Sequence, residues 1–329
     1  MRREILKILR ESNGKFVSGE SIAKKFNISR TAVWKHVQGL RKIGYTIDSV
    51  VKSGYALYSP PDLLLPDEIS NGLETKIIGR EIIYFDSTNS TNEQAKRIIN
   101  ERKNQIEDGI LLVTESQTAG KGRLDRKFYS PYAKGILFSI IIRPDVPLQD
   151  APKFTLAIAA AISQAMEDFG LKPGIKWPND IMYKGKKLVG ILTEMSAEID
   201  RVHCIIIGCG INFSIEKFPP EIEEIATSIE IMRRDLGVEK FSRVQFLQRI
   251  LIRFDDIYRE ILTHGFEKTL NMWKKYSITL GKSIKVIPAG EIENSFEGRA
   301  IDLDSSGALI VEKLDGSKVH VLAGDVSIR

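Results

Sequence analysis

The chain has 329 residues, 43% of them hydrophobic and 28% charged; these proportions are ordinary for a protein with a buried core and exclude a mainly disordered one. The longest mostly apolar stretch, Phe154–Met166, is far shorter than the roughly 20 residues of a membrane span, and the N-terminus lacks the apolar core of a signal peptide, so we expect a cytoplasmic protein with no membrane partner. The net charge of +5 is uneven, because residues 1–60 contain twelve Lys and Arg but only four Asp and Glu, which indicates a module that binds a polyanion.

Residues 1–60 have the pattern of three short helices followed by a β-hairpin. Apolar residues of the first helix share one face, and Ser18 and Ser29 are placed to cap the next two helices. Residues 45–58 alternate around a glycine-containing turn, as in a hairpin. This order of elements predicts a winged helix-turn-helix, in which the second helix of the motif enters the major groove of DNA.

The predicted DNA-binding region runs from Gly19 to Gln38. Lys and Arg side chains at the start of its second helix are expected to contact phosphates or guanine edges, and hydroxyl groups to reach phosphates. A small helical bundle with a basic, solvated face is the alternative. The residues predicted to contact DNA are Ser29, Arg30, Thr31, Trp34 and Lys35.

The pair Pro60–Pro61 predicts a linker, because proline removes a backbone donor. Residues 63–275 then alternate between strand and helix patterns, which predicts an α+β domain with a mixed sheet and covering helices. The expected helices are Asn89–Arg102, Ala151–Phe169 and Ser242–His264. The expected strands are Ile82–Phe85, Ile110–Val113, Gly135–Ile142, Leu188–Thr193 and Cys204–Gly208.

From residue 278 to residue 329 the pattern changes to short alternating strands between turn signals. Strands are expected at 284–287, 297–303, 308–312 and 319–322. This spacing predicts a small C-terminal β-barrel of the SH3-like type. The predicted fold class is therefore α+β multidomain, with an N-terminal winged helix-turn-helix (residues 1–60), a central α+β domain (63–275) and the C-terminal barrel (278–329).

Residues 120–127, with the sequence GKGRLDRK, are the stretch most informative about function. Gly120 and Gly122 let the backbone approach a ligand closely, and four cations lie within seven residues. Such a loop suits a phosphate or carboxylate ligand. It lacks both the Gly-Lys-Ser/Thr ending of a P-loop and the G-x-G-x-x-G pattern. A basic surface loop that binds nothing is the alternative on composition alone.

Five further motifs flank this loop in the sequence. Two precede it, DSTNSTN at residues 86–92 and TESQTA at 114–119, and three follow it, KWPND at 176–180, GKKLVGIL at 185–192 and GCGIN at 208–212. In this order and spacing the motifs resemble the catalytic domain of biotin–protein ligases. With the N-terminal helix-turn-helix included, the whole chain resembles the bifunctional ligases that also repress a biotin operon.

The resemblance implies a reaction in two steps. Biotin and Mg-ATP form biotinyl-5′-adenylate and release pyrophosphate, and a lysine of a biotin carboxyl carrier domain then attacks the adenylate and releases AMP. The first step brings a carboxylate onto a phosphate, so cations that neutralise both lower its barrier. The resemblance assigns this catalytic role to Lys187 at the biotin carboxylate and to Arg123, whose guanidinium grips anionic oxygens in a fork.

The same resemblance implies the binding residues and the cofactors biotin, ATP and Mg²⁺. Asp180 is the expected magnesium ligand, since magnesium prefers carboxylate and phosphate oxygens. Biotin is expected to contact Ser87, Thr88, Asn89, Gln117, Lys121, Gly122, Arg123 and Lys187. ATP or the adenylate is expected to contact Arg126, Lys176, Asn179, Asp180 and Asn212.

The loop departs from the family's commonest pattern at three positions. Lys121 stands where arginine is usual, Asp125 where glycine is frequent, and Phe128 where tryptophan is frequent. Lysine keeps the charge but loses the bidentate fork, and the aspartate partly cancels the field of its cationic neighbours. These changes bear on how tightly the adenylate is retained rather than on whether catalysis occurs.

The implied partners are a biotin carboxyl carrier domain, operator DNA and a second copy of the chain that pairs on adenylate or DNA binding. Three rival functions remain open: a ligand-sensing repressor without ligase activity, a lipoate ligase, and a ligase whose N-terminal domain does not regulate transcription. Three assays distinguish these functions. Biotin-dependent pyrophosphate exchange tests ligase activity, titration with biotin and with lipoate tests the substrate, and DNA titration at several salt concentrations tests the N-terminal domain.

Overall fold

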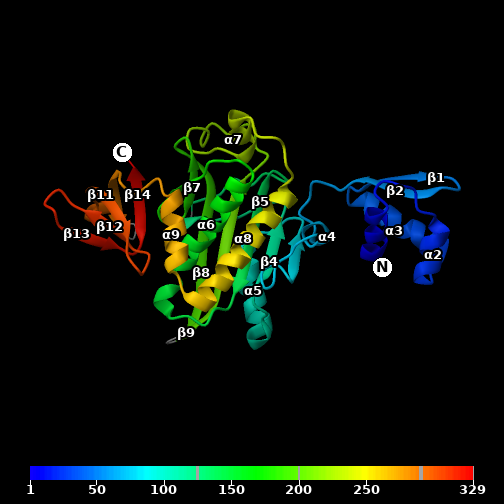
Figure 1. The fold of residues 1–329 in the computed structure, drawn as a ribbon, viewed down its shortest axis with the longest axis horizontal. Helices are drawn as coiled ribbons and strands as arrows, with labels where there is room; N and C mark the ends of the chain where they lie inside the picture. Colours follow the sequence, from blue (N-terminus) through cyan, green and yellow to red (C-terminus); the bar gives the residue numbers. More distant parts are fainter. Residues whose placement is uncertain (124–125, 199–200, 289–291, 329) are drawn as a thin grey trace. The chain divides into compact units, whose positions relative to one another are not determined.

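The computed structural model describes residues 1–123, 126–198, 201–288 and 292–328. The chain divides into two compact units, Met1–Leu63 and Leu64–Arg329, and each is described by itself. Figure 1 shows the elements of both in chain order. No helix in the described ranges is long and apolar enough to cross a membrane.

The N-terminal unit is the predicted winged helix-turn-helix. Its elements are α1 (Arg2–Glu11), α2 (Gly19–Phe26), α3 (Arg30–Lys42), β1 (Thr46–Val50) and β2 (Gly54–Ser59). The side chains of Ser18 and Ser29 accept hydrogen bonds from backbone N–H groups in the first turns of α2 and α3, which is the capping that the sequence predicts. Its core is formed by Ile5, Leu6, Leu9, Ile22, Val33, Val37, Leu40 and Ala56.

Gly54 fixes where the hairpin returns toward the helices. Its φ is +107°, and a Cβ atom there would lie 1.9 Å from the carbonyl oxygen of Val17. That approach lets Val17 exchange two backbone hydrogen bonds with Tyr55, so the segment before α2 pairs with the second hairpin strand. Any other residue at position 54 would push the two segments apart.

In the described part of the second unit, seven strands form a mixed sheet in the order β3-β4-β5-β9-β8-β7-β6. The β3–β4 pair is parallel and the remaining pairs are antiparallel. The strands are β3 (Ile82–Phe85), β4 (Ile110–Thr114), β5 (Gly135–Ile142), β6 (Gly174–Lys176), β7 (Asp180–Tyr183), β8 (Lys186–Glu198) and β9 (Arg201–Asn212). The mixed sheet with covering helices confirms the predicted class of this domain.

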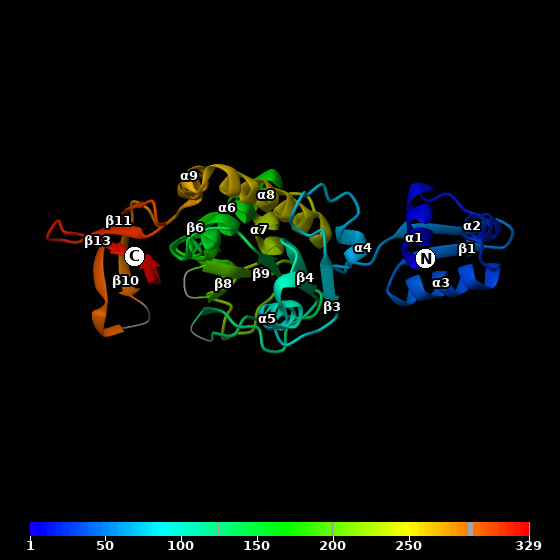
Figure 2. The same cartoon turned by 90° about the horizontal axis from the view of Figure 1, so that it is seen from below.

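Helices cover the two faces of this sheet unequally (Figures 1 and 2). α6 (Lys153–Asp168), α8 (Arg243–His264) and α9 (Glu267–Tyr276) pack on one face, and α5 (Thr91–Arg102) covers part of the other. The other helices among the described residues of this unit are α4 (Pro66–Ile69), α7 (Ile229–Leu236) and the 3-10 turns η1 (Lys103–Gln105), η3 (Leu148–Asp150) and η4 (Ile292–Asn294).

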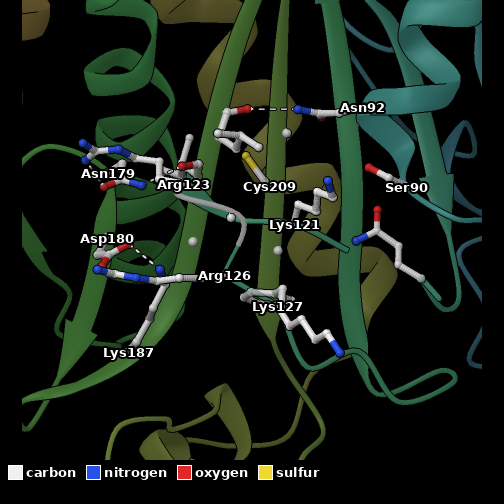
Figure 3. A pocket seen from close by; sticks show the side chains of 18 of the residues that line it. Ser90, Asn92, Lys121, Arg123, Arg126, Lys127, Asn179, Asp180, Lys187 and Cys209 are labelled. Carbon is white, nitrogen blue, oxygen red and sulfur yellow. Dashed lines mark hydrogen bonds and ion pairs between the residues drawn. The ribbon is translucent and has the colours of Figure 1, made fainter. Parts of the chain in front are cut away.

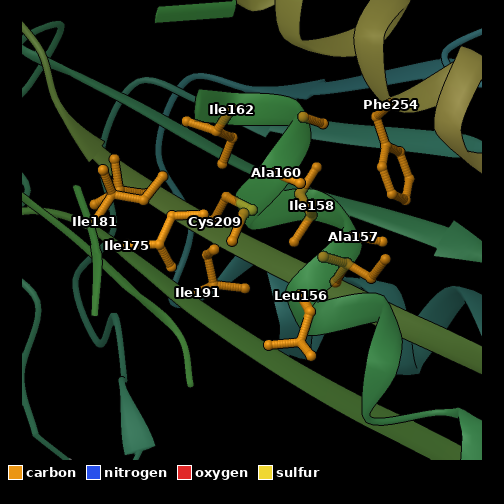
Figure 4. Close-up of a cluster of buried hydrophobic side chains, with 14 of the residues drawn as sticks. Leu156, Ala157, Ile158, Ala160, Ile162, Ile175, Ile181, Ile191, Cys209 and Phe254 are labelled. Atoms are coloured by element: carbon orange, nitrogen blue, oxygen red, sulfur yellow. The ribbon is translucent and has the colours of Figure 1, made fainter. Parts of the chain in front are cut away.

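The core follows from the alternation of side chains along the strands. In β9, Ile205, Ile207, Cys209 and Ile211 join the large core beneath α6 and α8, whereas Cys204 and Ile206 pack against α5. Figure 4 shows the first of these cores, where Ile158 and Ile162 of α6 lie beside Ile191 and Cys209 of the sheet. The next two residues of β9 on the α5 face are Gly208 and Gly210. Because glycine has no side chain, the sheet is bare at this point.

The C-terminal segment folds as an antiparallel sheet in the order β13-β12-β11-β10-β14, consistent with the predicted SH3-like type. Its strands are β10 (Ser283–Pro288), β11 (Phe296–Leu303), β12 (Leu309–Glu312), β13 (Lys318–Val321) and β14 (Gly324–Ile328). The sequence did not predict β14, which follows β13 after two residues and pairs with β10 instead.

Three other differences separate the predicted elements from the observed ones. β6 and β7 flank Trp177–Asn179 and are too short to carry a periodic pattern. β8 and β9 each extend well beyond their predicted bounds, because their polar ends pair with each other in one long hairpin. α4, α7 and α9 were not predicted.

A fully buried ion pair joins three distant parts of the second unit. The Nη1 atom of Arg243 in α8 lies 2.8 Å from Oε2 of Glu115, and both side chains are 0% exposed. The other carboxylate oxygen of Glu115 accepts a hydrogen bond from the backbone N–H of Leu64 at 2.6 Å, and Arg243 also donates to the carbonyl oxygen of Gly135 at 2.9 Å. Glu115 directly follows β4, so this pair fixes the segment that leads to Gln117.

Candidate active site

A pocket of about 460 Å³ opens on the α5 face of the large sheet. Its floor is the β8–β9 pair, where Gly190 lies opposite Gly210 and Leu192 opposite Gly208. Its walls come from the start of α5, from residues 121–123 and 126–128 and from β7. Segments that lie far apart in the sequence therefore meet at one bare patch of the sheet.

The glycines of the floor are required by close neighbours. A Cβ atom on Gly208 would lie 2.2 Å from Oδ1 of Asn92, and one on Gly210 would lie 2.7 Å from the ring of Phe128. Asn92 is itself fixed from both ends, since its Nδ2 donates to Glu194 at 2.7 Å and its Oδ1 accepts from Ser139 at 2.6 Å. The glycines thus create the depth of the pocket.

The described lining of the pocket is strongly cationic. It includes five Lys and Arg side chains and two carboxylates, which leaves three positive charges in excess. A concave site with this excess attracts and concentrates anions. The cations are Lys121, Arg123, Arg126, Lys127 and Lys187, and the carboxylates are Asp180 and Asp325.

Lys187 lies at the start of β8 and faces the first residue of β7. Its Nζ atom is 2.6 Å from Oδ1 of Asp180 (Figure 3). The backbone of Lys187 is held on its other side, because its N–H donates to Ile225 at 2.7 Å and its carbonyl oxygen accepts from Thr227 at 2.9 Å. The ammonium group is therefore delivered to the pocket from a fixed strand, as a preorganised charge requires.

Arg123 lies on the same side of the pocket as Asp180, beside Asn179 (Figure 3). Its Nη1 donates to Oδ1 of Asn179 at 3.3 Å and its Nη2 to the carbonyl oxygen of Gly324 at 2.9 Å. Asn179 is buried, and its Nδ2 donates to the carbonyl oxygen of Ile191 at 2.8 Å. The guanidinium is thereby fixed between the KWPND turn and the C-terminal sheet.

Neutral polar groups line the side nearest to α5. Oε1 of Gln117 accepts from the backbone N–H of Thr91 at 2.8 Å and from its hydroxyl at 3.2 Å. The hydroxyl oxygens of Ser139 and Thr91 lie 2.7 Å apart. This side suits a polar but uncharged part of a ligand, whereas the opposite side suits an anion.

Family models match three consecutive parts of the chain. Residues 2–56 match a helix-turn-helix domain, residues 84–212 match the biotin/lipoate A/B protein ligase family, and residues 279–329 match the biotin protein ligase C-terminal domain. The bifunctional ligase/repressor BirA of Bacillus subtilis is 39% identical over 100% of this chain and 98% of its own length. The chain belongs to the biotin protein ligase family. Four relatives that align along 97–100% of this chain are bifunctional ligase/repressors.

More distant members of the family agree with this placement. The bifunctional ligase/repressor BirA of Escherichia coli is 27% identical and aligns with 97% of this chain and 94% of its own length. A biotin protein ligase from Aquifex aeolicus, solved in complex with biotin and ATP, has a TM-score of 0.63 and 25% identity. That structure covers 76% of this chain and 99% of its own.

Most of the residues predicted from the family resemblance lie together in the pocket. Its lining contains Gln117, Lys121, Gly122, Arg123, Arg126, Asn179, Asp180 and Lys187. Phe128 also lines it and lies over the glycine floor. Asp125, the remaining departure from the family pattern, is outside the described residues.

Five predicted residues do not line the described pocket. Ser87 accepts from the hydroxyl of Ser116, and Thr88 and Asn89 form a local network with Gln94. Lys176 pairs with Asp180 along the β6–β7 ladder, and Asn212 ends β9 opposite Gly135. Their predicted roles in binding are untested by this geometry.

The pocket also contains polar residues that sequence reasoning missed. Ser90, Thr91 and Asn92 at the start of α5 take the position expected for the three residues before them. The sequence Ser-Thr-Asn occurs twice in residues 87–92, and the start of α5 brings the second copy to the pocket, whereas the sequence analysis assigned only the first. Asp325 was missed because its strand was not predicted.

Both cysteines are free and buried, and Cys209 also lines the pocket. Burial raises the pKa of the Cys209 thiol far above its usual range, and burial likewise raises the pKa of Cys204. Both therefore remain protonated at neutral pH, as small buried residues do.

The candidate nucleic-acid interface is the exposed N-terminal end of α3. Ser29, Arg30, Thr31 and Lys35 are exposed there, and the side chain of Trp34 is 51% exposed. Ser29 is also the helix cap and accepts from the N–H of Ala32 at 3.1 Å. A helix start with exposed cations and free backbone N–H groups is suited to DNA phosphates.

Proposed function

We propose that the protein is an ATP-dependent biotin–protein ligase that also represses transcription in response to biotin. An oxygen of the biotin carboxylate attacks the α-phosphorus of ATP, and pyrophosphate leaves. The amine of a lysine on a biotin carboxyl carrier domain then attacks the biotinyl carbonyl, and AMP leaves. The observation that carries the proposal is the glycine-floored pocket lined by five Lys and Arg side chains and by neutral polar groups.

Lys187 and Arg123 are proposed to neutralise the two reacting anions. Lys187 is supplied by a strand that is hydrogen-bonded on both sides, and Arg123 is held by Asn179 and by a backbone carbonyl. Both cations therefore need little reorganisation when charge develops between carboxylate and phosphate, which is how preorganised charges lower a barrier. No covalent enzyme intermediate is needed.

The polar side of the pocket is proposed to receive the ureido ring of biotin. Gln117, Thr91 and the backbone near Gly122 offer hydrogen-bonding groups there, and the bare β8–β9 glycines provide an apolar floor. A largely apolar wall with a few placed polar groups is the usual design of a vitamin pocket. Ser87, Thr88 and Asn89 remain proposed contributors through the loop that they stabilise.

The side that contains Asn179, Asp180 and Arg126 is proposed to receive ATP, with Lys176 and Asn212 nearby. Asp180 would hold Mg²⁺ together with phosphate oxygens, because magnesium needs only one or two protein carboxylates when phosphates supply the rest. The described residues contain no group of three or more His, Cys, Asp or Glu side chains that could hold a metal ion. The ion would supply charge neutralisation at the phosphates.

The test of the ligase is biotin-dependent exchange of labelled pyrophosphate into ATP. We expect exchange with biotin and none with lipoate under the same conditions. Exchange with lipoate alone would make the protein a lipoate ligase, and binding of biotin without exchange would leave a ligand-sensing repressor. Because ATP and DNA are its proposed ligands, we propose a cytoplasmic location.

The N-terminal unit is proposed to bind operator DNA through α3. Replacing Arg30 with alanine is expected to weaken operator binding and to lower the slope of log K against log salt by about 0.9, the effect of losing one phosphate contact. Biotin transfer should be unchanged. DNA titrations at several salt concentrations measure the slope, and Lys7→Ala in α1 is the control of equal charge. Equal loss of DNA binding and transfer would contradict separate sites.

We propose further that two copies of the chain pair when adenylate forms, so that two α3 helices reach a palindromic operator. The second half-site contact then occurs at high effective concentration, and by linkage the adenylate must be held more tightly in the pair by the same factor. Sedimentation with and without biotin plus ATP should detect the change. An unchanged oligomeric state and unchanged operator affinity would remove the biotin-responsive part of the proposal.

A further inference from the structure

One carboxylate of the C-terminal sheet reaches into the candidate active site. Asp325, the second residue of β14, lines the pocket and places one oxygen on each of two arginines. Its Oδ1 is 3.3 Å from Nη1 of Arg123, and its Oδ2 is 2.9 Å from Nη2 of Arg126. Two guanidinium groups that share one anion in this way form the arrangement by which arginines bind phosphate and carboxylate ligands.

The position of this carboxylate is set by the backbone of β14. Asp325 pairs with Ile287 of β10, and the preceding Gly324 has a φ of +153° with room for no side chain, since a Cβ would lie 2.7 Å from the carbonyl oxygen of Ile287. The carbonyl oxygen of Gly324 accepts a hydrogen bond from Arg123 as well. The strand therefore presents two adjacent acceptors to the cationic wall.

The two arginines differ in how firmly they are held. Arg123 has three described acceptors, Asn179, Gly324 and Asp325, and its side chain is 28% exposed. Arg126 is described with Asp325 alone, and its side chain is 71% exposed. An incoming anion that binds Arg126 therefore has to displace one described partner, Asp325. Arg123 would keep its hydrogen bonds to Asn179 and Gly324 if Asp325 were displaced.

We propose that, in the ligand-free protein, the Asp325 carboxylate occupies the position on the Arg126 guanidinium at which a phosphate group of ATP binds. When ATP binds, this phosphate displaces the carboxylate. Asp325 is thus a positioning residue. It keeps the two cations of the loop aimed into the pocket, and it lowers the affinity for the phosphate because the two anions compete for one guanidinium. This inference rests on the proposed use of ATP.

The competition gives Asp325 an effect opposite in sign to that of a substrate-binding residue. Removing its charge should strengthen the binding of ATP and of inorganic pyrophosphate, since Arg126 no longer has to release a partner. A partly exposed ion pair is a modest competitor, so we expect a gain of about threefold to fivefold in affinity. A residue that only stabilised the C-terminal sheet would weaken binding or leave it unchanged.

The experiment is calorimetric titration of the full chain with ATP and, separately, with inorganic pyrophosphate. Asp325→Asn should lower the dissociation constant of both by about threefold to fivefold, and Asp325→Glu, which keeps the charge, should stay within about twofold of wild type. The matched control is Asp302→Asn, which removes the same charge from an aspartate of the same sheet that pairs with Lys274 at 2.7 Å. The control should bind like wild type.

A second arm separates direct contact from the general field of the carboxylate. In an Arg126→Ala background, Asp325→Asn should no longer tighten binding, because the guanidinium for which the anions compete is gone. An unchanged or weaker affinity in Asp325→Asn, or an equal gain with and without Arg126, would overturn the proposal. Pyrophosphate exchange by the wild type tests the ligase independently, so a failure there and a failure here can be told apart.

Discussion

Replacing Lys187 with alanine is expected to slow adenylate formation by about 10²- to 10³-fold, the loss typical of removing one preorganised group that stabilises developing charge. The ammonium is delivered by β8 at 2.6 Å from Asp180, so its removal also leaves that carboxylate without its cationic partner, facing the incoming phosphates. Both consequences disfavour the approach of the biotin carboxylate to ATP.

Lys186 provides the matched control for this substitution. Its side chain has the same exposure of 37% as that of Lys187, but its Nζ donates to the carbonyl oxygen of Glu223 and does not line the described pocket. Lys186→Ala should retain near-wild-type pyrophosphate exchange, and both variants should unfold like the parent. Exchange by Lys187→Ala within a few-fold of wild type would show that the assignment of Lys187 is wrong.

Replacing Glu115 with glutamine is expected to destabilise the second unit by about 3–5 kcal/mol, because the fully buried Arg243 would lose the charge of the Glu115 carboxylate. Glutamine preserves the shape and one acceptor for the N–H of Leu64, so the loss measures the buried charge rather than a cavity. The same substitution should loosen the segment from Glu115 to Gln117 and weaken biotin binding.

The measurement is urea unfolding followed by tryptophan fluorescence in a Trp34→Phe background. Trp177 and Trp273 are buried in the second unit, and Trp34 is the tryptophan of the first, so this background reports the second unit alone. Glu81→Gln is the control, since Glu81 forms a partly exposed pair with Arg102, of a kind that contributes about 1 kcal/mol or less. Equal losses for Glu81→Gln and Glu115→Gln would contradict the account of the buried pair.

Local pattern was sufficient for much of the fold. The caps Ser18 and Ser29, the charge of the first 60 residues and the alternation of the C-terminal strands each act over a few residues, so they can be read without knowing the tertiary structure. The mixed sheet was also accessible, because its central strands β4 and β5 are continuous apolar runs.

The remaining features depend on contacts between distant residues. Residue 208 must be glycine because a Cβ atom there would collide with the side chain of Asn92. No residue near Gly208 in the sequence indicates this contact. Likewise, β14 is recognised by its pairing with β10, and Asp325 acquires a role only because that pairing brings it to Arg126. The cationic loop was predicted from its composition. The carboxylate that faces it, Asp325, lies about 200 residues further along the chain, so its place beside the loop could not be predicted.

The central claim is that this chain transfers biotin to protein, and one measurement tests it most directly. The full chain is incubated with biotin, Mg-ATP and a purified biotin carboxyl carrier domain, and the intact mass of the carrier domain is recorded. The account predicts a mass increase of one biotinyl group on a single lysine, which requires both biotin and ATP and is strongly slowed by Lys187→Ala. An unmodified carrier domain in the complete mixture, with the protein folded and biotin bound, would contradict it.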